Sequence, residues 1–268
     1  MTEKEVIENT KEPITLQRIV YDLEQAGIKT TDTLIVHSAM SKMGYVVGKE
    51  MTVVDALLET VINGTLVMSA QTGDNSDPSL WKNPPVPLEW IEIIKEHTPS
   101  FNPKTFSTRG MGRVVECFRS YPKIYRSNHP QVSFIAKGKD ARYITKKHEL
   151  TPCFGENSPL AKLYELDAVV LLLGVSYDNA TIFHYAEYLS DTLKKEKQGS
   201  KIKGKWVEFE DYAYTSDDFG TLGKAFEREG YVKKTMVGQA ECLIFSARNA
   251  VNFGAEWFEK TRKQKIDL

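Results

Sequence analysis

The sequence predicts an α/β protein with a layered α-β-α architecture around a mixed, largely parallel central sheet. Short apolar runs of β type alternate along the chain with segments of helical periodicity. The run at 168–175, AVVLLLGV, is apolar on both faces, as a central strand covered on both sides should be. A length of 268 residues, 41% of them hydrophobic, is enough for a sizeable core. We therefore expect a single domain over residues 1–268.

The first expected element is an amphipathic helix at 15–26, one face of which carries Leu16, Ile19, Val20 and Leu23. Six strands are expected after it, at 33–38, 65–70, 132–136, 168–175, 231–237 and 242–247. Helical patterns follow these strands at 52–61, 88–96, 112–120, 181–190, 217–229 and 249–262. Two long loops, which often carry function, are expected at 71–87 and 97–108.

The composition excludes several classes of protein. With 35 basic and 36 acidic residues, the chain lacks the positive charge that drives nucleic-acid binding. The start, MTEKEVIENTKE, has no apolar stretch typical of a signal peptide, and no run approaches the roughly 18 apolar residues of a membrane span. Three cysteines without a CxxC spacing indicate neither a disulfide framework nor a cysteine zinc site. We expect a cytoplasmic enzyme without nucleic-acid or membrane partners.

The most informative local pattern is YDNATIFHYAEYLSD at 177–191, directly after the predicted central strand. Asn179 or Thr181 can cap a helix here. Helical spacing then places on one polar stripe His184, Glu187, Tyr188 and Asp191. The opposite arc, expected to face the core, holds Ile182, Phe183, Ala186 and Leu189. The first turns of such a helix lie near the carboxyl edge of the sheet, where ligands bind in open α/β folds.

This stripe suggests general-base chemistry. An attacking amine must lose a proton, and a histidine oriented by a carboxylate accepts protons near neutral pH. His184 with Glu187, or with Asp178 at the turn, meets that requirement. An ordinary surface histidine is the alternative interpretation. A metal shared by His184 and Glu187 is a third, although no second histidine pair of suitable spacing is present.

The segment 33–48, TLIVHSAMSKMGYVVG, is a candidate anion site. A strand, a small-residue loop and a helix N-terminus together favour phosphate, and a pyrophosphate could closely approach Ser38, Ser41 and Gly44. The segment has neither the P-loop nor the GxGxxG pattern, and RGMGR at 109–113 lacks the glycine spacing of the GNAT acetyl-CoA loop. A turn without a ligand remains an equal interpretation.

Acidic residues gather in two places. Residues 208–218 hold five acids and no base, and the loop at 71–87 contributes Asp74 and Asp77. Carboxylates that line a cleft attract a polycation. Solvated acidic surface is the alternative.

Several segments together resemble the aminoglycoside N3-acetyltransferase family (the antibiotic N-acetyltransferase family), which is unrelated in fold to GNAT. The resemblance covers the chain from about residue 12 to the end, and its most specific elements are RSNHPxxSF, SPL and NxTxxHxxE, which begin at 126, 158 and 179. The matching segments are 34–48, 64–87, 101–138, 156–187 and 206–219.

The resemblance implies that acetyl-CoA and an amine react in a ternary complex. The cofactor would lie along the loop after the first strand, its pyrophosphate near His37, Ser38, Ala39, Met40 and Ser41. Its pantetheine arm and thioester would lie near Ser107, Thr108, Met111 and Gly112. No metal is expected.

The resemblance also assigns roles in catalysis. His184 would be the general base for the 3-amino group of a deoxystreptamine ring, and CoA thiolate would leave. Glu187, Asp178 and an acid from 208–217, for which we favour Asp211, would orient it and hold the ammonium groups. The substrate-binding acids would be Asp74, Asp77, Glu187, Glu210 and Asp217. The partner is then a cationic small molecule, and a homodimer is one arrangement that the sequence leaves open.

Three alternatives remain at this point. The acceptor could be a different amine metabolite, because the cofactor and base motifs would be the same. The acetyl group could pass through a cysteine, Cys117 or Cys153, although neither shows the surroundings of an activated thiolate. The third alternative is a metal-dependent hydrolase built around His184 and Glu187.

Overall fold

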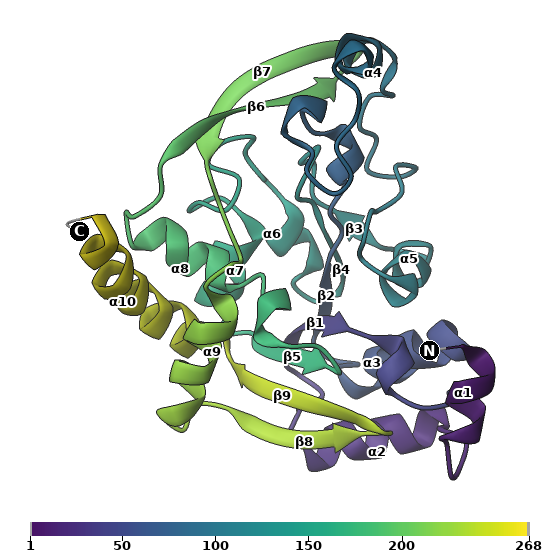
Figure 1. The fold of residues 1–268 in the computed structure, drawn as a ribbon. Helices are drawn as coiled ribbons and strands as arrows, with labels where there is room; N and C mark the ends of the chain where they lie inside the picture. Colours follow the sequence, from purple (N-terminus) through teal and green to yellow (C-terminus); the bar gives the residue numbers. More distant parts are fainter. Residues whose placement is uncertain (1, 267–268) are drawn as a thin grey trace.

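The computed structural model describes residues 2–266 and shows a large sheet between two helical layers, with a separate hairpin at one end (Figure 1). In spatial order the seven strands of the sheet are β3 (Tyr125–Arg126), β4 (Phe134–Gly138), β2 (Thr65–Ser69), β1 (Thr33–Ser38), β5 (Val169–Leu173), β9 (Ala240–Ser246) and β8 (Lys233–Val237). The hairpin consists of β6 (Lys195–Ile202) and β7 (Lys205–Tyr212). Residues 1, 267 and 268 of the expected domain lie outside the described residues.

The sheet is mixed, which confirms the predicted α/β class. Strands β2, β1 and β5 are parallel, and Ile35 of β1 is in register with Val67 on one side and Val170 on the other. All pairings toward the two edges are antiparallel. Strands joined by a tight turn, such as β8 and β9, pair in this way. Parallel pairing is therefore confined to the centre, which is less of the sheet than the sequence suggested.

Helices cover both faces of the sheet. One layer contains α6 (Ala141–Thr145), α7 (Pro159–Glu165), α8 (Phe183–Leu189), α9 (Phe219–Arg228) and α10 (Ala247–Ile266). The other contains α2 (Leu16–Gln25), α3 (Lys49–Thr60) and α5 (Arg113–Arg119). Side chains of the central strands alternate between the layers, so that Ile35 packs with α8 while Leu34 and Val36 pack with α3. The buried run predicted at 168–175 is confirmed, since 170–173 are fully buried.

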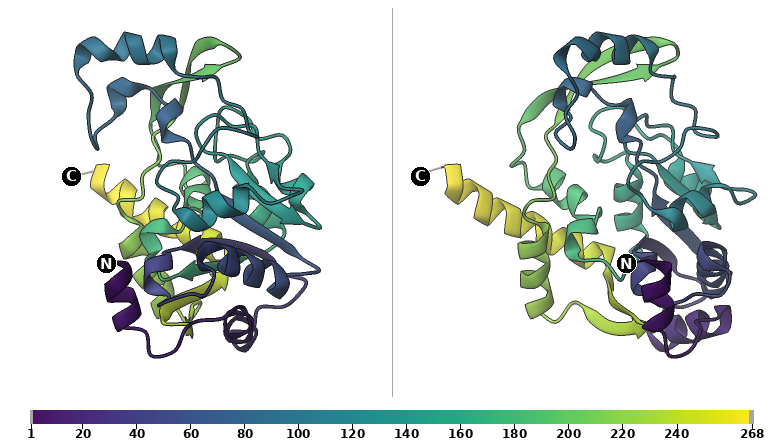
Figure 2. Two further views of the ribbon diagram at one scale, coloured as in Figure 1. Left: turned by 90° about the vertical axis from the view of Figure 1, so that its right-hand side faces the viewer. Right: turned by 45° about the vertical axis from the view of Figure 1, so that its right-hand side comes forward.

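The two long loops fold against the hairpin, near α4 (Ile91–His97), in both views of Figure 2. The Asn75 side chain bonds both backbone groups of Lys201, at 2.8 and 3.2 Å. The backbone N–H of Gly204 donates to the Ser100 hydroxyl at 2.6 Å. These contacts tether β6 and β7 to loops 71–87 and 97–108, and so fix the hairpin over one edge of the sheet.

The sequence did not indicate every element. The six expected strands are present with small shifts at their ends, whereas α1 (Glu3–Glu8), α6, α7, β3 and the hairpin were not expected. No strand was expected in the acidic segment 208–218, but its first five residues belong to β7. The hairpin turns at Lys203 and Gly204, with φ angles of 49° and 81°, as in a type I′ turn. No helix within residues 2–266 has the length and apolarity needed to cross a bilayer.

Candidate active site

A histidine and a glutamate from one helix form the centre of the site. His184 lies in the first turn of α8, and its Nδ1 is 2.6 Å from Oε2 of Glu187. The Glu187 side chain is fully buried, whereas His184 keeps 14% of its side-chain surface exposed. Because a carboxylate only accepts, Nδ1 carries the hydrogen and Nε2 of the neutral ring carries a lone pair. The pair therefore has the arrangement of an oriented base.

Aromatic rings fix the plane of this imidazole. Phe154 stacks on His184 with 4.8 Å between ring centroids and 2° between planes. Tyr214 meets the ring edge-on at 5.7 Å, and Phe219 approaches at 4.8 Å. With the ring held between these side chains and bonded to Glu187, rotation about its side-chain bonds is restricted.

His184 opens onto a polar cavity of about 220 Å³. The hairpin contributes two carboxylates to its lining, Glu196 of β6 and Asp211 of β7, which lie opposite each other in register. The other polar side chains that line it are Gln71, Gln131, Gln198, Tyr212 and Tyr214. Carboxylates in such a setting favour a cationic ligand.

Asp211 is buried, and no ion pair joins it to a basic side chain in the described part of the chain. Its carboxylate accepts hydrogen bonds from the backbone N–H groups of Cys153 and Tyr212, at 3.0 and 2.8 Å, and from the Thr151 hydroxyl at 3.2 Å. Only 3% of the residue is exposed. These neutral donors stabilise the carboxylate but leave its charge uncompensated, so it can still attract a cation in the cavity.

The carboxyl ends of β1 and β2 meet the turn that leads into α8. His37 shares the face of β1 that carries Ile35, and its Nε2 is buried without a hydrogen-bond partner in the described part of the chain. Burial, aided by the charge of His184, lowers the pKa of His37 to about 4. The Ser69 hydroxyl of β2 donates to Thr181 at 3.3 Å. A neutral histidine thus lies close to His184.

A second cavity, of about 330 Å³, lies beside the first predicted cofactor segment and reaches Arg113, the residue after the second. Met40 and Ser41 line it from the β1 side, and Lys49 and Arg113 contribute positive charge. Ala39 is anchored to β5 because its N–H donates to the Leu173 carbonyl at 2.9 Å. Ser38 ends β1, so residues 37–41 run from the surroundings of His184 to this cavity.

The segment before α5 faces open space. Gly112, the N-cap of α5, and Gly110 have φ angles of 84° and 73°, and no atom lies within 4 Å of a Cβ added at either. Ser107 is exposed, and Thr108 donates its backbone N–H to Glu116 at 2.7 Å. Met111 packs against the layer of α3 and α5. At Gly110 and Gly112 the backbone therefore has free space on the side where a Cβ would lie.

Comparison with known proteins identifies the family. A family model described as aminoglycoside 3-N-acetyltransferase matches residues 35–259. The chain belongs to the aminoglycoside 3-N-acetyltransferase family. The SPbeta prophage-derived aminoglycoside N(3′)-acetyltransferase-like protein YokD of Bacillus subtilis (strain 168) is 44% identical over 98% of this chain and 99% of its own. Aminoglycoside N(3)-acetyltransferase VIII of Streptomyces fradiae is 34% identical, over 97% and 96%.

Solved structures agree with this assignment. The crystal structure of YokD has a TM-score of 0.94 and 42% identity, with 97% of this chain and 99% of that chain covered. AAC-IIIb, solved as a binary complex with CoASH, has a TM-score of 0.80 and 28% identity, with 93% and 97% covered. The predicted family, the α/β fold class and the enzyme class, acyl transfer, are confirmed.

One acid that was expected beside His184 lies away from it in this member of the aminoglycoside 3-N-acetyltransferase family. Asp178 is exposed, accepts from the Ser176 hydroxyl at 2.8 Å and lies beside Gly220 of α9. It does not orient His184, because the Nδ1 atom is bonded to Glu187. This corrects the expectation that Asp178 would share the role of Glu187.

The expected substrate acids are also dispersed. Asp74 pairs with Arg109, and Asp77 caps a turn and lies 3.4 Å from Lys95, so local cations already compensate both. Glu210 is exposed on the side of β7 opposite to Asp211, and exposed Asp217 donates its N–H to Thr215. None of these four lines the 220 Å³ cavity, whereas Asp211 does.

The polar stripe on α8 differs from the prediction. Neither Asn179 nor Thr181 caps the helix, whose N-cap is Ile182 without a side-chain hydrogen bond. Leu189, expected in the core, is 44% exposed, whereas Glu187 is fully buried. Packing of α10 on α8 explains the difference, since it covers the glutamate.

Several residues of the site were not singled out from the sequence. Glu196 and Gln198 enter the cavity through β6, and the signal that could have found them is Lys203-Gly204 between two segments of strand length. Arg262 contacts Glu187 from the far end of the chain, and no local pattern marks it. Within residues 2–266, no three His, Cys, Asp or Glu side chains are grouped to hold a metal ion.

Proposed function

We propose that the protein transfers the acetyl group of acetyl-CoA to the 3-amino group of a 2-deoxystreptamine aminoglycoside, with His184 as the general base. The observation that carries this proposal is the His184–Glu187 pair at the wall of a cavity that also holds Asp211 and Glu196. Family membership and relatives named as aminoglycoside N(3)-acetyltransferases support the choice of acceptor. The CoASH complex of AAC-IIIb supports the choice of donor.

The reaction needs one proton transfer. The amine nitrogen attacks the thioester carbonyl carbon, an N–C bond forms, the C–S bond breaks, and the sulfur leaves as CoA thiolate. Nε2 of His184 accepts the amine proton, and Glu187 stabilises the imidazolium through Nδ1. Asp211 and Glu196 hold other ammonium groups of the acceptor, which places the reacting amine beside the base.

Acetyl-CoA lies along residues 37–41 and 107–112 in this proposal. Lys49 and Arg113 provide positive charge for its phosphates at the 330 Å³ cavity, although Glu3 and Glu50 pair with them at 3.0 and 2.8 Å. The run from Met40 back to His37 leads the donor toward His184.

Direct transfer is favoured over an acyl-cysteine. Cys153 lines the cavity, but burial raises the pKa of its thiol well above the ordinary value. Burial also raises the pKa of Cys117. Since the thiolate is the nucleophile in covalent catalysis, neither cysteine is prepared for that role at neutral pH.

Thiol release from acetyl-CoA with a panel of 2-deoxystreptamine aminoglycosides tests the proposal. In His184→Ala we expect kcat to fall by about 100- to 10,000-fold, with the wild-type Tm retained, because general-base catalysis contributes that much. His97→Ala is the matched control, since the His97 side chain is 72% exposed on α4. Near wild-type turnover in His184→Ala would refute the base. Binding of acetyl-CoA without thiol release would instead indicate a different amine acceptor.

A further inference from the structure

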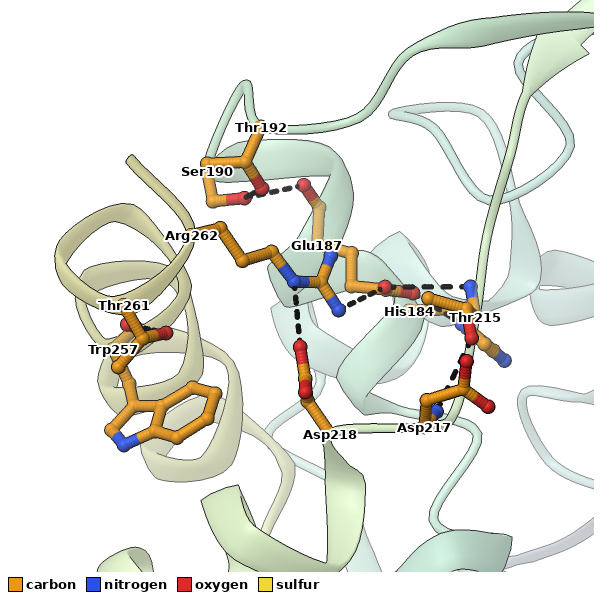
Figure 3. Close-up of polar contacts among 10 residues, drawn as sticks. All are labelled: His184, Glu187, Ser190, Thr192, Thr215, Asp217, Asp218, Trp257, Thr261 and Arg262. Carbon is orange, nitrogen blue, oxygen red and sulfur yellow. Dashed lines mark hydrogen bonds and ion pairs between the residues drawn. The ribbon is translucent and has the colours of Figure 1, made fainter. Parts of the chain in front are cut away.

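The carboxylate oxygen of Glu187 that does not face His184, Oε1, has a partner on α10. Oε1 lies 2.8 Å from Nη2 of Arg262, which projects from α10 toward α8 (Figure 3). The guanidinium is 12% exposed and the carboxylate is fully buried. Nε of Arg262 also lies 3.1 Å from Oδ2 of Asp218, the residue before α9. Arg262 therefore joins α8, α9 and α10 behind the His184–Glu187 pair.

This contact has a geometric effect. A carboxylate on a flexible side chain can present either oxygen to a histidine. Oε1 forms an ion pair with the guanidinium and accepts a hydrogen bond from the backbone N–H of Thr215 at 3.5 Å, so Oε2 is the oxygen that faces Nδ1 of His184, at 2.6 Å. Arginine is suited to such a buried role because its charge is permanent and its donors are planar.

The contact also has an electrostatic effect. An imidazolium at position 184 would be attracted by Glu187 and repelled by the nearby guanidinium. Removal of the guanidinium leaves a buried carboxylate whose remaining described partners are the imidazole and the backbone N–H of Thr215, and of these two only the ring can take up a compensating positive charge. The guanidinium is thus a like charge for any imidazolium that forms when His184 accepts a proton.

We propose that Arg262 is a positioning residue, which fixes the Glu187 carboxylate and opposes the build-up of a second positive charge at His184. The inference rests on the proposed function of His184 as a base. The other titratable groups beside Arg262 or around the cavity that His184 lines are Asp218, His37, Tyr212, Tyr214, Asp211, Glu196 and Cys153. His37 is neutral at neutral pH, so among these described neighbours the positive charge comes from Arg262.

The pH profile of kcat/KM, measured by thiol release at saturating acetyl-CoA, separates this role from a purely structural one. In Arg262→Gln we expect the acidic limb to move to higher pH, with a loss of about tenfold at pH 6.5 that becomes small at about pH 9, because loss of a nearby cation shifts a titration by a unit or more. Arg262→Lys should restore the limb, because it keeps the charge. The control is Arg248→Gln, which removes an exposed ion pair with Asp167 from the same helix and should leave the pH profile unchanged.

A second variant and a second measurement test the role of Arg262 even if Arg262→Gln folds poorly or if the acceptor in the assay is not the right one. Asp218→Asn removes an anion from the guanidinium and should move the limb to lower pH. NMR titration of the histidine side chains follows His184 without any turnover, and in Arg262→Gln its protonation should occur at higher pH. An equal loss of activity at every pH, or an unmoved NMR titration, would overturn the role of Arg262. Failure of the acetylation assay alone would count only against the proposed function.

Discussion

Asp211 is a buried carboxylate that uses neutral donors in place of a cation. Its bonds to Cys153, Tyr212 and Thr151 hold it at the cavity wall, opposite Glu196. Cation binding at such a position leaves the bonds in place and adds an attraction that water screens weakly.

We expect Asp211→Asn to raise KM for the aminoglycoside by about 10- to 100-fold with a smaller change in kcat, because a hydrogen bond to a charged group contributes about 1.5–3 kcal/mol. The neighbouring exposed residue provides the control, Glu210→Gln, which should leave KM unchanged. Steady-state kinetics with varied acceptor, beside a Tm measurement, checks both. Equal KM values in the two variants would show that Asp211 does not contact the acceptor.

At the residue scale, the contact between His184 and Glu187 could be predicted because the two residues lie one helical turn apart. Any helix over 181–190 brings His184 and Glu187 together, whatever the rest of the fold. Arg262 and Glu196 could not be predicted in this way. They reach the site through packing of α10 and through the register of the hairpin, and both depend on contacts distant in sequence.

At the element scale, α9 packs closely against the turn that precedes α8. Gly223 faces the ring of Tyr177, and a Cβ at this position would lie 2.0 Å from a ring atom. Tyr177 belongs to the turn between β5 and α8, so this contact helps to set where α8 begins.

Gly223→Ala should therefore destabilise the protein by about 1–3 kcal/mol, because overpacking outweighs the gain in helix propensity. Thr221→Ala in the same helix is exposed and should be neutral or slightly stabilising. Urea unfolding compares the two variants. A Gly223→Ala protein as stable as wild type would mean that Tyr177 moves aside without cost.

Elements with a clear apolar pattern were predicted well, and polar ones were not. The strand at 33–38 agrees at both ends with β1, where four consecutive side chains are buried. β6, with the sequence KEKQGSKI, has little apolar alternation because its stability comes from pairing with β7 and from contacts such as that of Asn75 with Lys201. The residues that make β6 a strand therefore lie largely in the segments that it pairs with and contacts.

At the scale of the whole molecule, two buried histidines, His129 and His148, and the half-buried His37 link stability to pH. Burial lowers the pKa of His37 and of His129 to about 4, and that of His148 well below its ordinary value. The ordinary value, 6.5, applies when the chain unfolds. Between pH 6.5 and about 4 the unfolded chain thus binds more protons than the folded one.

The free energy of unfolding should therefore fall as the pH is lowered through 6.5 toward 4, and the contribution of these groups should become independent of pH well above 6.5. Each histidine can contribute a slope of up to about 1.4 kcal/mol per pH unit. Urea unfolding from pH 7.5 to 4.5 measures the slope, which should be smaller in His37→Gln and unchanged in His97→Gln. A wild-type midpoint that stays constant over this range would contradict the assignment.

The β6–β7 hairpin has a consequence for how the enzyme can diversify. It supplies Glu196, Gln198 and Asp211 to the cavity, yet it forms a sheet of its own apart from the seven strands that support α8 (Figure 1). Substitutions in residues 195–212 can alter which amine is admitted while the histidine and its supporting helices stay unchanged. Selection for a new acceptor should therefore change residues of the β6–β7 hairpin more than residues of the central strands.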